Sequence, residues 1–198
     1  MIHNKKEAIL LMPMKCATGT IFQILYNLGF VKFNQHHAVP AVIIDQFVTP
    51  NQFKNLFKIL PVRNPYDRLV SFYEFISIIY EEKGEVCYKN FDDFLLSHNY
   101  DDVNKNGGFL PMHRYYYLNN KPIKFGSIIR FETLESDIYK MLRKLGVEEM
   151  PHIPVVHKTN DHKPFQEYFV GRQDRIDIAY DKYKEDFELF GYSKEIVE

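Results

Sequence analysis

The stretch ILPVRNPYDRLVSFYEF, residues 59–75, joins an apolar run to a segment with helical periodicity. Asn64 is a suitable N-cap, Pro65 suits the first helical position, and Asp67 lies three residues after the cap. The pattern predicts a buried strand over 55–62 and then a helix whose apolar stripe consists of Leu69, Phe72, Tyr73, Ile76 and Tyr80.

The rest of the chain repeats this alternation. Residues 7–14 form a second short apolar run, residues 18–30 follow with helical spacing, and residues 123–131 predict another strand. Two more helices are predicted, one after the last strand and one from about Arg172, on the apolar positions Leu134, Ile138, Leu142, Leu145, Ile176, Ala179, Tyr183 and Phe187. Strands that alternate with helices favour a parallel sheet covered on both faces. We therefore predict an α/β fold, in which ligands bind at the carboxyl ends of the strands.

Length and composition place the chain among globular proteins. It has 198 residues, of which 45% are hydrophobic and 16% aromatic, so we expect a single domain over residues 1–198 with a sizeable core. The formal net charge of −1 gives no global attraction to nucleic acid or to anionic membranes. An anionic ligand would have to be bound by local groups of basic side chains and backbone amides.

The N-terminal segment and the cysteines indicate a cytoplasmic protein. The apolar run over residues 8–13 is too short for a signal-peptide core or a membrane span. Cys16 and Cys87 form no zinc-binding pattern and suggest no disulfide framework.

The segment PMKCATGT, residues 13–20, connects the first predicted strand to its helix. It combines Lys15, Thr18, Gly19 and Thr20 with a helix N-terminus, which is a chemistry suited to phosphate binding. The GxxxxGK[ST] pattern of a Walker A loop is absent. Taken alone, the segment is compatible with an anion-binding loop or with an ordinary strand-to-helix turn.

Arg63 ends the strand of the opening stretch, and Ser71 follows eight residues later. Ser71 lies about 200° around the helix from Leu69, away from the apolar stripe. Arg63 and Ser71 are therefore able to reach one ligand. The alternative is that Arg63 only pairs with Asp67.

Together, these segments resemble the sulfotransferases that use 3′-phosphoadenosine 5′-phosphosulfate (PAPS), most closely the carbohydrate, family 2-like branch. PMKCATGT is similar to the 5′-phosphosulfate loop of the KxA[ST]xT type, and PVRNPYDRLVSFY resembles the 3′-phosphate motif. IIRFETLESD and YKEDFELFGY resemble two further blocks of the family, in the same order along the chain. The resemblance implies a three-layer α/β/α, P-loop NTPase-like sulfotransferase fold.

The resemblance also implies roles for individual residues. Lys15 would contact the 5′-phosphosulfate and stabilise the leaving phosphate, and Arg63 and Ser71 would bind the 3′-phosphate. The remaining donor-binding candidates are the rest of the first loop, Phe131 at the adenine, and two lysines of a late basic loop: Cys16, Ala17, Thr18, Gly19, Thr20, Phe131, Lys158 and Lys163. Family members often have other residues where this chain has Thr18-Gly19, which leaves open which hydroxyl contacts the donor. For Cys16 we expect packing and not thiol chemistry.

Transfer also requires a base that takes the proton of the acceptor hydroxyl. His36 and His37 are the candidates, because His37-Ala38 matches a dipeptide found in this region of bacterial relatives. A histidine pKa near 6.5 suits this role at neutral pH. We favour His37, and no metal ion is predicted.

The acceptor is expected to be a carbohydrate or another small hydroxyl compound, which Arg114 and Tyr115–Tyr117 would face; the alternative for the three tyrosines is packing in the core. We predict sulfuryl transfer from PAPS in the cytoplasm of a bacterium or of a virus-infected cell. Two alternatives stay open: a non-catalytic nucleotide-binding relative, and an ATP-dependent P-loop-like kinase, which the missing GK[ST] disfavours.

Overall fold

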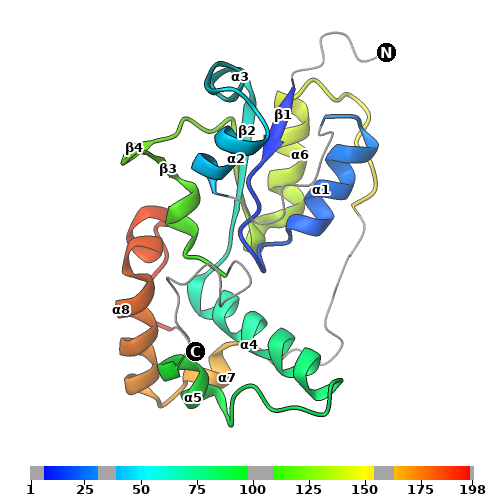
Figure 1. Ribbon diagram of the computed structural model, residues 1–198. Coiled ribbons are helices and arrows are strands. Elements are labelled where there is room, and N and C mark those ends of the chain that lie inside the picture. Colours follow the sequence, from blue (N-terminus) through cyan, green and yellow to red (C-terminus); the bar gives the residue numbers. More distant parts are fainter. Residues whose placement is uncertain (1–6, 31–38, 98–108, 154–162, 197–198) are drawn as a thin grey trace. The chain divides into compact units, whose positions relative to one another are not determined.

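The computed structural model describes residues 7–30, 39–97, 109–153 and 163–196 (Figure 1). The chain forms two compact units. Unit 1 contains residues 1–62 and 112–158, and unit 2 contains residues 63–111 and 159–198. His36, His37 and Lys158 lie outside the described residues.

Unit 1 contains a three-stranded parallel sheet in the order β1-β2-β5, which confirms the predicted α/β class. The strands are β1 (Ala8–Leu10), β2 (Phe57–Val62) and β5 (Ser127–Arg130), each shorter than its apolar run. Register pairs Leu10 with Ile59 and Val62 with Arg130. Because all three strands run in the same direction, their carboxyl ends share one edge of the sheet.

One face of this sheet packs on α1 (Thr18–Asn27) and α6 (Leu134–Lys144), both of which were expected from their periodicity. Figure 1 shows the two helices beside β1. After α1, Gly29 adopts a φ of 72°, and the N–H of Phe30 donates to the carbonyl of Leu25. This is the left-handed helix stop for which glycine is suited. The shared core contains Ala8, Leu10, Ile21, Leu25, Ile59, Ile129, Ile138 and Leu142.

The opposite face carries a buried lysine. Lys58 alternates with Ile59 along β2, so it points away from α1 and α6. Its ammonium donates to the carbonyls of Lys54 and Leu56 at 3.1 and 3.0 Å and lies 5.0 Å from the ring centre of Phe53. Lys54 and Phe53 belong to α3 (Pro50–Asn55), so the Lys58 side chain contacts the end of this helix. Burial lowers the pKa of Lys58.

Unit 1 has further short elements that were not predicted. These are α2 (Pro40–Gln46), α3, the 3-10 helices η1 (Met112–Tyr115) and η2 (Phe131–Thr133), and the antiparallel pair β3 (Tyr117–Leu118) and β4 (Lys121–Pro122). α3 begins with a capping box, in which Thr49 and Gln52 exchange hydrogen bonds.

Unit 2 is helical and is built on α4 (Pro65–Glu81), with α5 (Phe91–Ser97), α7 (Gln166–Phe169) and α8 (Gln173–Phe190). The Asn64 side chain accepts a hydrogen bond from the N–H of Tyr66 at 2.9 Å, which confirms the predicted N-cap. Aromatic rings form much of the core. Tyr66 lies 4.8 Å from both Phe169 and Phe187, measured between ring centres.

Candidate functional site

The loop after β1 has an unusual backbone. Lys15 and Ala17 adopt φ values of 62° and 55°, in the left-handed region. Left-handed backbone costs a non-glycine residue about 1–2 kcal/mol, and such strain concentrates at functional sites. Left-handed residues in a turn also direct successive N–H groups toward one concave, anion-binding side. The backbone of this loop is therefore compatible with an anion site.

The start of α1 adds to this chemistry. Its N-cap is Ala17, which makes no side-chain cap hydrogen bond, and no acidic residue occupies the first turn. The helix N-terminus consequently keeps its partial positive charge, which favours anions. Thr18 and Thr20 are 7% and 5% exposed, Gly19 is exposed, and Lys15 is half-buried.

Cys16 anchors this loop inside unit 1. It is fully buried, and its Sγ lies 3.6 Å from the Met14 carbonyl and 3.7 Å from the Met112 sulfur. Met112 begins η1, so the loop packs on that 3-10 helix. The environment of Cys16 is that of a packing residue, as expected.

Arg63 follows β2 directly and is 6% exposed. Its Nε donates to Oδ2 of Asp67 at 2.7 Å, and its Nη2 donates to Oδ1 at 2.8 Å. The structure thus contains the ion pair of the alternative interpretation. These two bonds engage two of the five N–H donors of the guanidinium.

Ser71 is buried on α4, one helical turn beyond Asp67. Residues four apart lie on the same side of a helix. The ion pair therefore directs Arg63 toward the side of α4 that carries Ser71.

The end of β5 is held by a carboxylate. Asp137 accepts hydrogen bonds from the Arg130 N–H at 3.1 Å and from the Thr133 hydroxyl at 2.8 Å, and it pairs with Lys140 at 3.0 Å. Burial alone raises the pKa of Asp137, but these hydrogen bonds outweigh it, so its pKa lies below the usual value. Phe131, the adenine candidate, follows in η2 and is half-buried.

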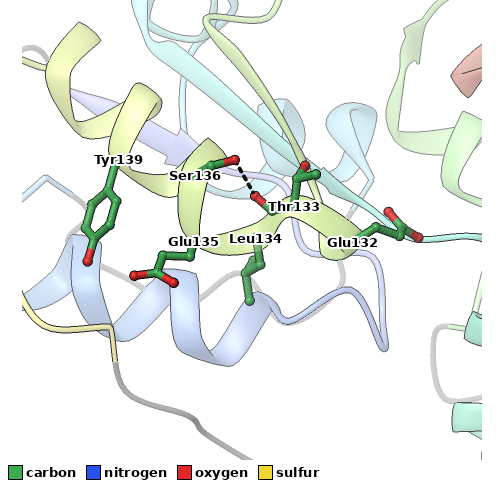
Figure 2. A pocket seen from close by; sticks show the side chains of 6 residues that line it. All are labelled: Glu132, Thr133, Leu134, Glu135, Ser136 and Tyr139. Atoms are coloured by element: carbon green, nitrogen blue, oxygen red, sulfur yellow. Dashed lines mark hydrogen bonds between the residues drawn. The ribbon is translucent and has the colours of Figure 1, made fainter.

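A hollow open to solvent lies at the start of α6 (Figure 2). In Figure 2, the side chains of Leu134, Glu135 and Tyr139 point to one side of the helix, while the Ser136 hydroxyl turns back to the Thr133 carbonyl at 3.0 Å. Glu132 and Glu135 line the hollow together with Thr133, Leu134, Ser136 and Tyr139. None of these six is a predicted donor-binding residue. Because two carboxylates repel phosphate, we do not assign the donor to this hollow.

The remaining candidates have simpler surroundings. Lys163 is exposed, as is Arg114 in η1. Tyr115 is fully buried, so it is a core residue, whereas Tyr116 and Tyr117 are half-buried.

Sequence reasoning missed two features of these sites. One is the contact of Met112 with Cys16, which joins residues 96 positions apart and has no local signal. The other is Asp137 as the group that holds the end of β5, although its place in the first turn of α6 is a recognisable signal for an anchoring carboxylate.

Within the described parts of the chain, every helix is too short or too polar to cross a membrane. A search of curated proteins and a search of solved structures each found no match.

A family model described as the sulfotransferase family matches residues 15–193. The matched region begins at Lys15 and includes the left-handed loop, the Arg63–Ser71 segment and the end of β5. It spans most of the 198 residues, which confirms the resemblance to the family 2-like branch. The chain belongs to the sulfotransferase family.

Proposed function

We propose that this chain transfers a sulfuryl group from PAPS to a hydroxyl of a carbohydrate or a related small acceptor. The observation that carries the proposal is the family match, which starts at Lys15 and runs through both segments that we propose to bind anions. Its support from the structure is the left-handed backbone at Lys15 and Ala17 before an uncapped helix start.

The donor would be bound at its two ends. In this proposal, the 5′-phosphosulfate binds Lys15 and the N–H groups and hydroxyls of residues 16–20, and the 3′-phosphate binds Arg63 and Ser71. Phe131 packs on the adenine, and Lys158 and Lys163 add charge near the phosphates. We also propose that both compact units belong to one sulfotransferase domain, with P-loop-like α/β/α layering, because the family match crosses both units.

The chemical step is an in-line displacement. The acceptor oxygen attacks sulfur while the bond between sulfur and the bridging phosphate oxygen breaks, and the bonding electrons leave on that oxygen. The acceptor proton passes to His37, with His36 as the alternative base. Lys15 and the amides of the loop stabilise the negative charge on the departing phosphate, since such transfers depend mainly on alignment and charge stabilisation.

Nucleotide binding tests the donor. We expect 3′-phosphoadenosine 5′-phosphate to bind much more tightly than adenosine 5′-phosphate in calorimetry. Arg63→Ala should abolish most of that preference, whereas the exposed Arg143→Ala, a matched loss of one arginine, should keep it. Equal binding of the two nucleotides by the unaltered protein would contradict the proposal.

Transfer of labelled sulfate from PAPS to a panel of sugars tests the reaction. Lys15→Ala and His37→Ala should reduce turnover by about 10²-fold or more while the proteins stay folded. Tight nucleotide binding with no transfer to any sugar would favour the non-catalytic alternative. Strict dependence on ATP and Mg²⁺ would favour the kinase.

A further inference from the structure

The ion pair between Arg63 and Asp67 lies within unit 2 and is held by two hydrogen bonds. Both side chains are largely shielded from water, with 7% of the Arg63 side chain and 15% of the Asp67 side chain exposed. The two hydrogen bonds, at 2.7 and 2.8 Å, engage Nε and Nη2 with one carboxylate oxygen each. A two-point contact of this kind fixes the plane of a guanidinium as well as its position.

Asp67 is itself held in place by the start of α4. Asn64 caps the helix, Pro65 occupies its first position, and Asp67 completes the first turn. A carboxylate there is also stabilised by the positive end of the helix dipole. The Asp67 carboxylate thus has a fixed position at the start of the helix, and its two hydrogen bonds restrict the orientation of the Arg63 side chain.

The ion pair fixes the orientation of Arg63 beside Ser71. Asp67 contacts the edge of the guanidinium that is formed by Nε and Nη2. Ser71 stands one turn further along the same side of α4. A phosphate between Arg63 and Ser71 would meet a guanidinium that is already oriented.

We propose that Asp67 is a positioning residue, through which the chain distinguishes nucleotides with a 3′-phosphate from those without one. This inference rests on the proposed donor. Asp67 also carries a negative charge close to the phosphate, and by repulsion alone it would weaken binding. The proposal is therefore that orientation outweighs repulsion, and the two effects predict opposite signs when the charge is removed.

The experiment measures the dissociation constants of 3′-phosphoadenosine 5′-phosphate and of adenosine 5′-phosphate by calorimetry. The ratio of the two dissociation constants reports recognition of the 3′-phosphate alone, because general damage to the fold weakens the binding of both nucleotides. Asp67→Asn should reduce the ratio about 10-fold or more, the range expected when a charge-assisted contact loses its geometry. Asp67→Glu keeps the carboxylate and should retain most of the ratio.

Glu188→Gln is the matched control, because it removes one negative charge from an exposed position of α8 in the same unit. It should leave the ratio unchanged. Asp67→Ser is a second neutral variant that suits a helix start, and it keeps the test valid if Asp67→Asn is poorly folded.

An unchanged ratio in either neutral variant would overturn the inference, and so would a raised ratio, which would show that repulsion dominates. If the unaltered protein itself does not prefer the 3′-phosphorylated nucleotide, the proposed donor is wrong. That result is distinguishable, because it appears before any substitution at Asp67.

Discussion

Arg68 donates a hydrogen bond of 2.6 Å from its Nη2 to the backbone carbonyl of Leu110, and the residue is 1% exposed. The guanidinium carbon also lies 4.1 Å from the centre of the Phe109 ring. Phe109 in turn stacks on Phe72, with 3.7 Å between ring centres. Arg68 and Phe72 belong to α4, so this helix holds residues 109 and 110 through one hydrogen bond and two contacts with the Phe109 ring.

We expect Arg68→Ala to lower the free energy of unfolding by about 2–4 kcal/mol, because it leaves the Leu110 carbonyl without this donor and opens a cavity beside Phe109. Urea unfolding measures the change. Arg143→Ala, at an exposed position of α6, should change stability by less than about 0.5 kcal/mol. Equal stability of the two variants would contradict the role assigned to Arg68.

The contacts of Asp92 should make the stability of the fold depend on pH in the acidic range. Asp92 accepts hydrogen bonds from Arg175 at 2.6 and 2.8 Å and from Arg172 at 3.0 Å. The Arg175 hydrogen bond is the main reason that its pKa lies below the usual value of 3.8. A carboxylate whose pKa is lower in the folded state stabilises the fold above the unfolded-state pKa and loses this contribution as the pH falls through the folded-state pKa.

Asp92→Asn should therefore be less stable than the unaltered protein at neutral pH, and the difference should shrink as the pH falls below about 4. Thermal unfolding between about pH 3 and pH 7 measures this trend. Glu188→Gln removes a carboxylate from a weaker, exposed pair with Lys184 at 3.8 Å and should show a smaller difference. A constant gap between Asp92→Asn and the unaltered protein at every pH would disprove the linkage.

The same substitution, alanine to glycine, should have opposite effects on stability at Ala17 and at Ala179. Because the φ of Ala17 is 55°, Ala17→Gly should be neutral or stabilise the protein by up to about 1 kcal/mol. Ala179→Gly, in the buried interior of α8, should destabilise it by about 1 kcal/mol or more. Chemical unfolding of both variants measures the difference, and a clear loss of stability in Ala17→Gly would argue against the left-handed backbone.

Leu142 tests the core that joins α6 to the sheet. It is fully buried, so Leu142→Ala should cost about 2–5 kcal/mol, the sum of lost burial and a residual cavity. Leu96 on α5 is 67% exposed, and the same substitution there should cost less than about 0.5 kcal/mol. An equal fall of the urea midpoint in both variants would contradict the burial of Leu142.

The elements that sequence analysis located are those with local signals. α4 has its cap at Asn64, α1 has its stop at Gly29, and α6 has an apolar stripe that includes Ile138 and Leu142. The predicted strands came out too long, because an apolar run continues into the buried loop after β1, where Leu11 and Met12 are still covered.

The elements that it missed are short. α2 and α5 have seven residues each and α3 has six, which is too few for a periodic pattern to be distinguished from a loop. At the candidate site, the loop residues and the Arg63–Ser71 pair were predicted, but whether Arg63 contacts Asp67 was open, since both outcomes fit the same residues.

The sequence by itself indicated the main strands and helices, the two segments that we propose to bind anions, and the family, because caps, stops, apolar periodicity and motifs involve residues within a few positions of one another. Only the tertiary structure decided which polar residues enter the interior. Arg68 and Lys58 are of residue types that usually stay at the surface, yet both are buried. The physical reason is that a buried charge requires hydrogen-bond partners. For Arg68 that partner is Leu110, 42 residues away, where no local pattern can reveal it.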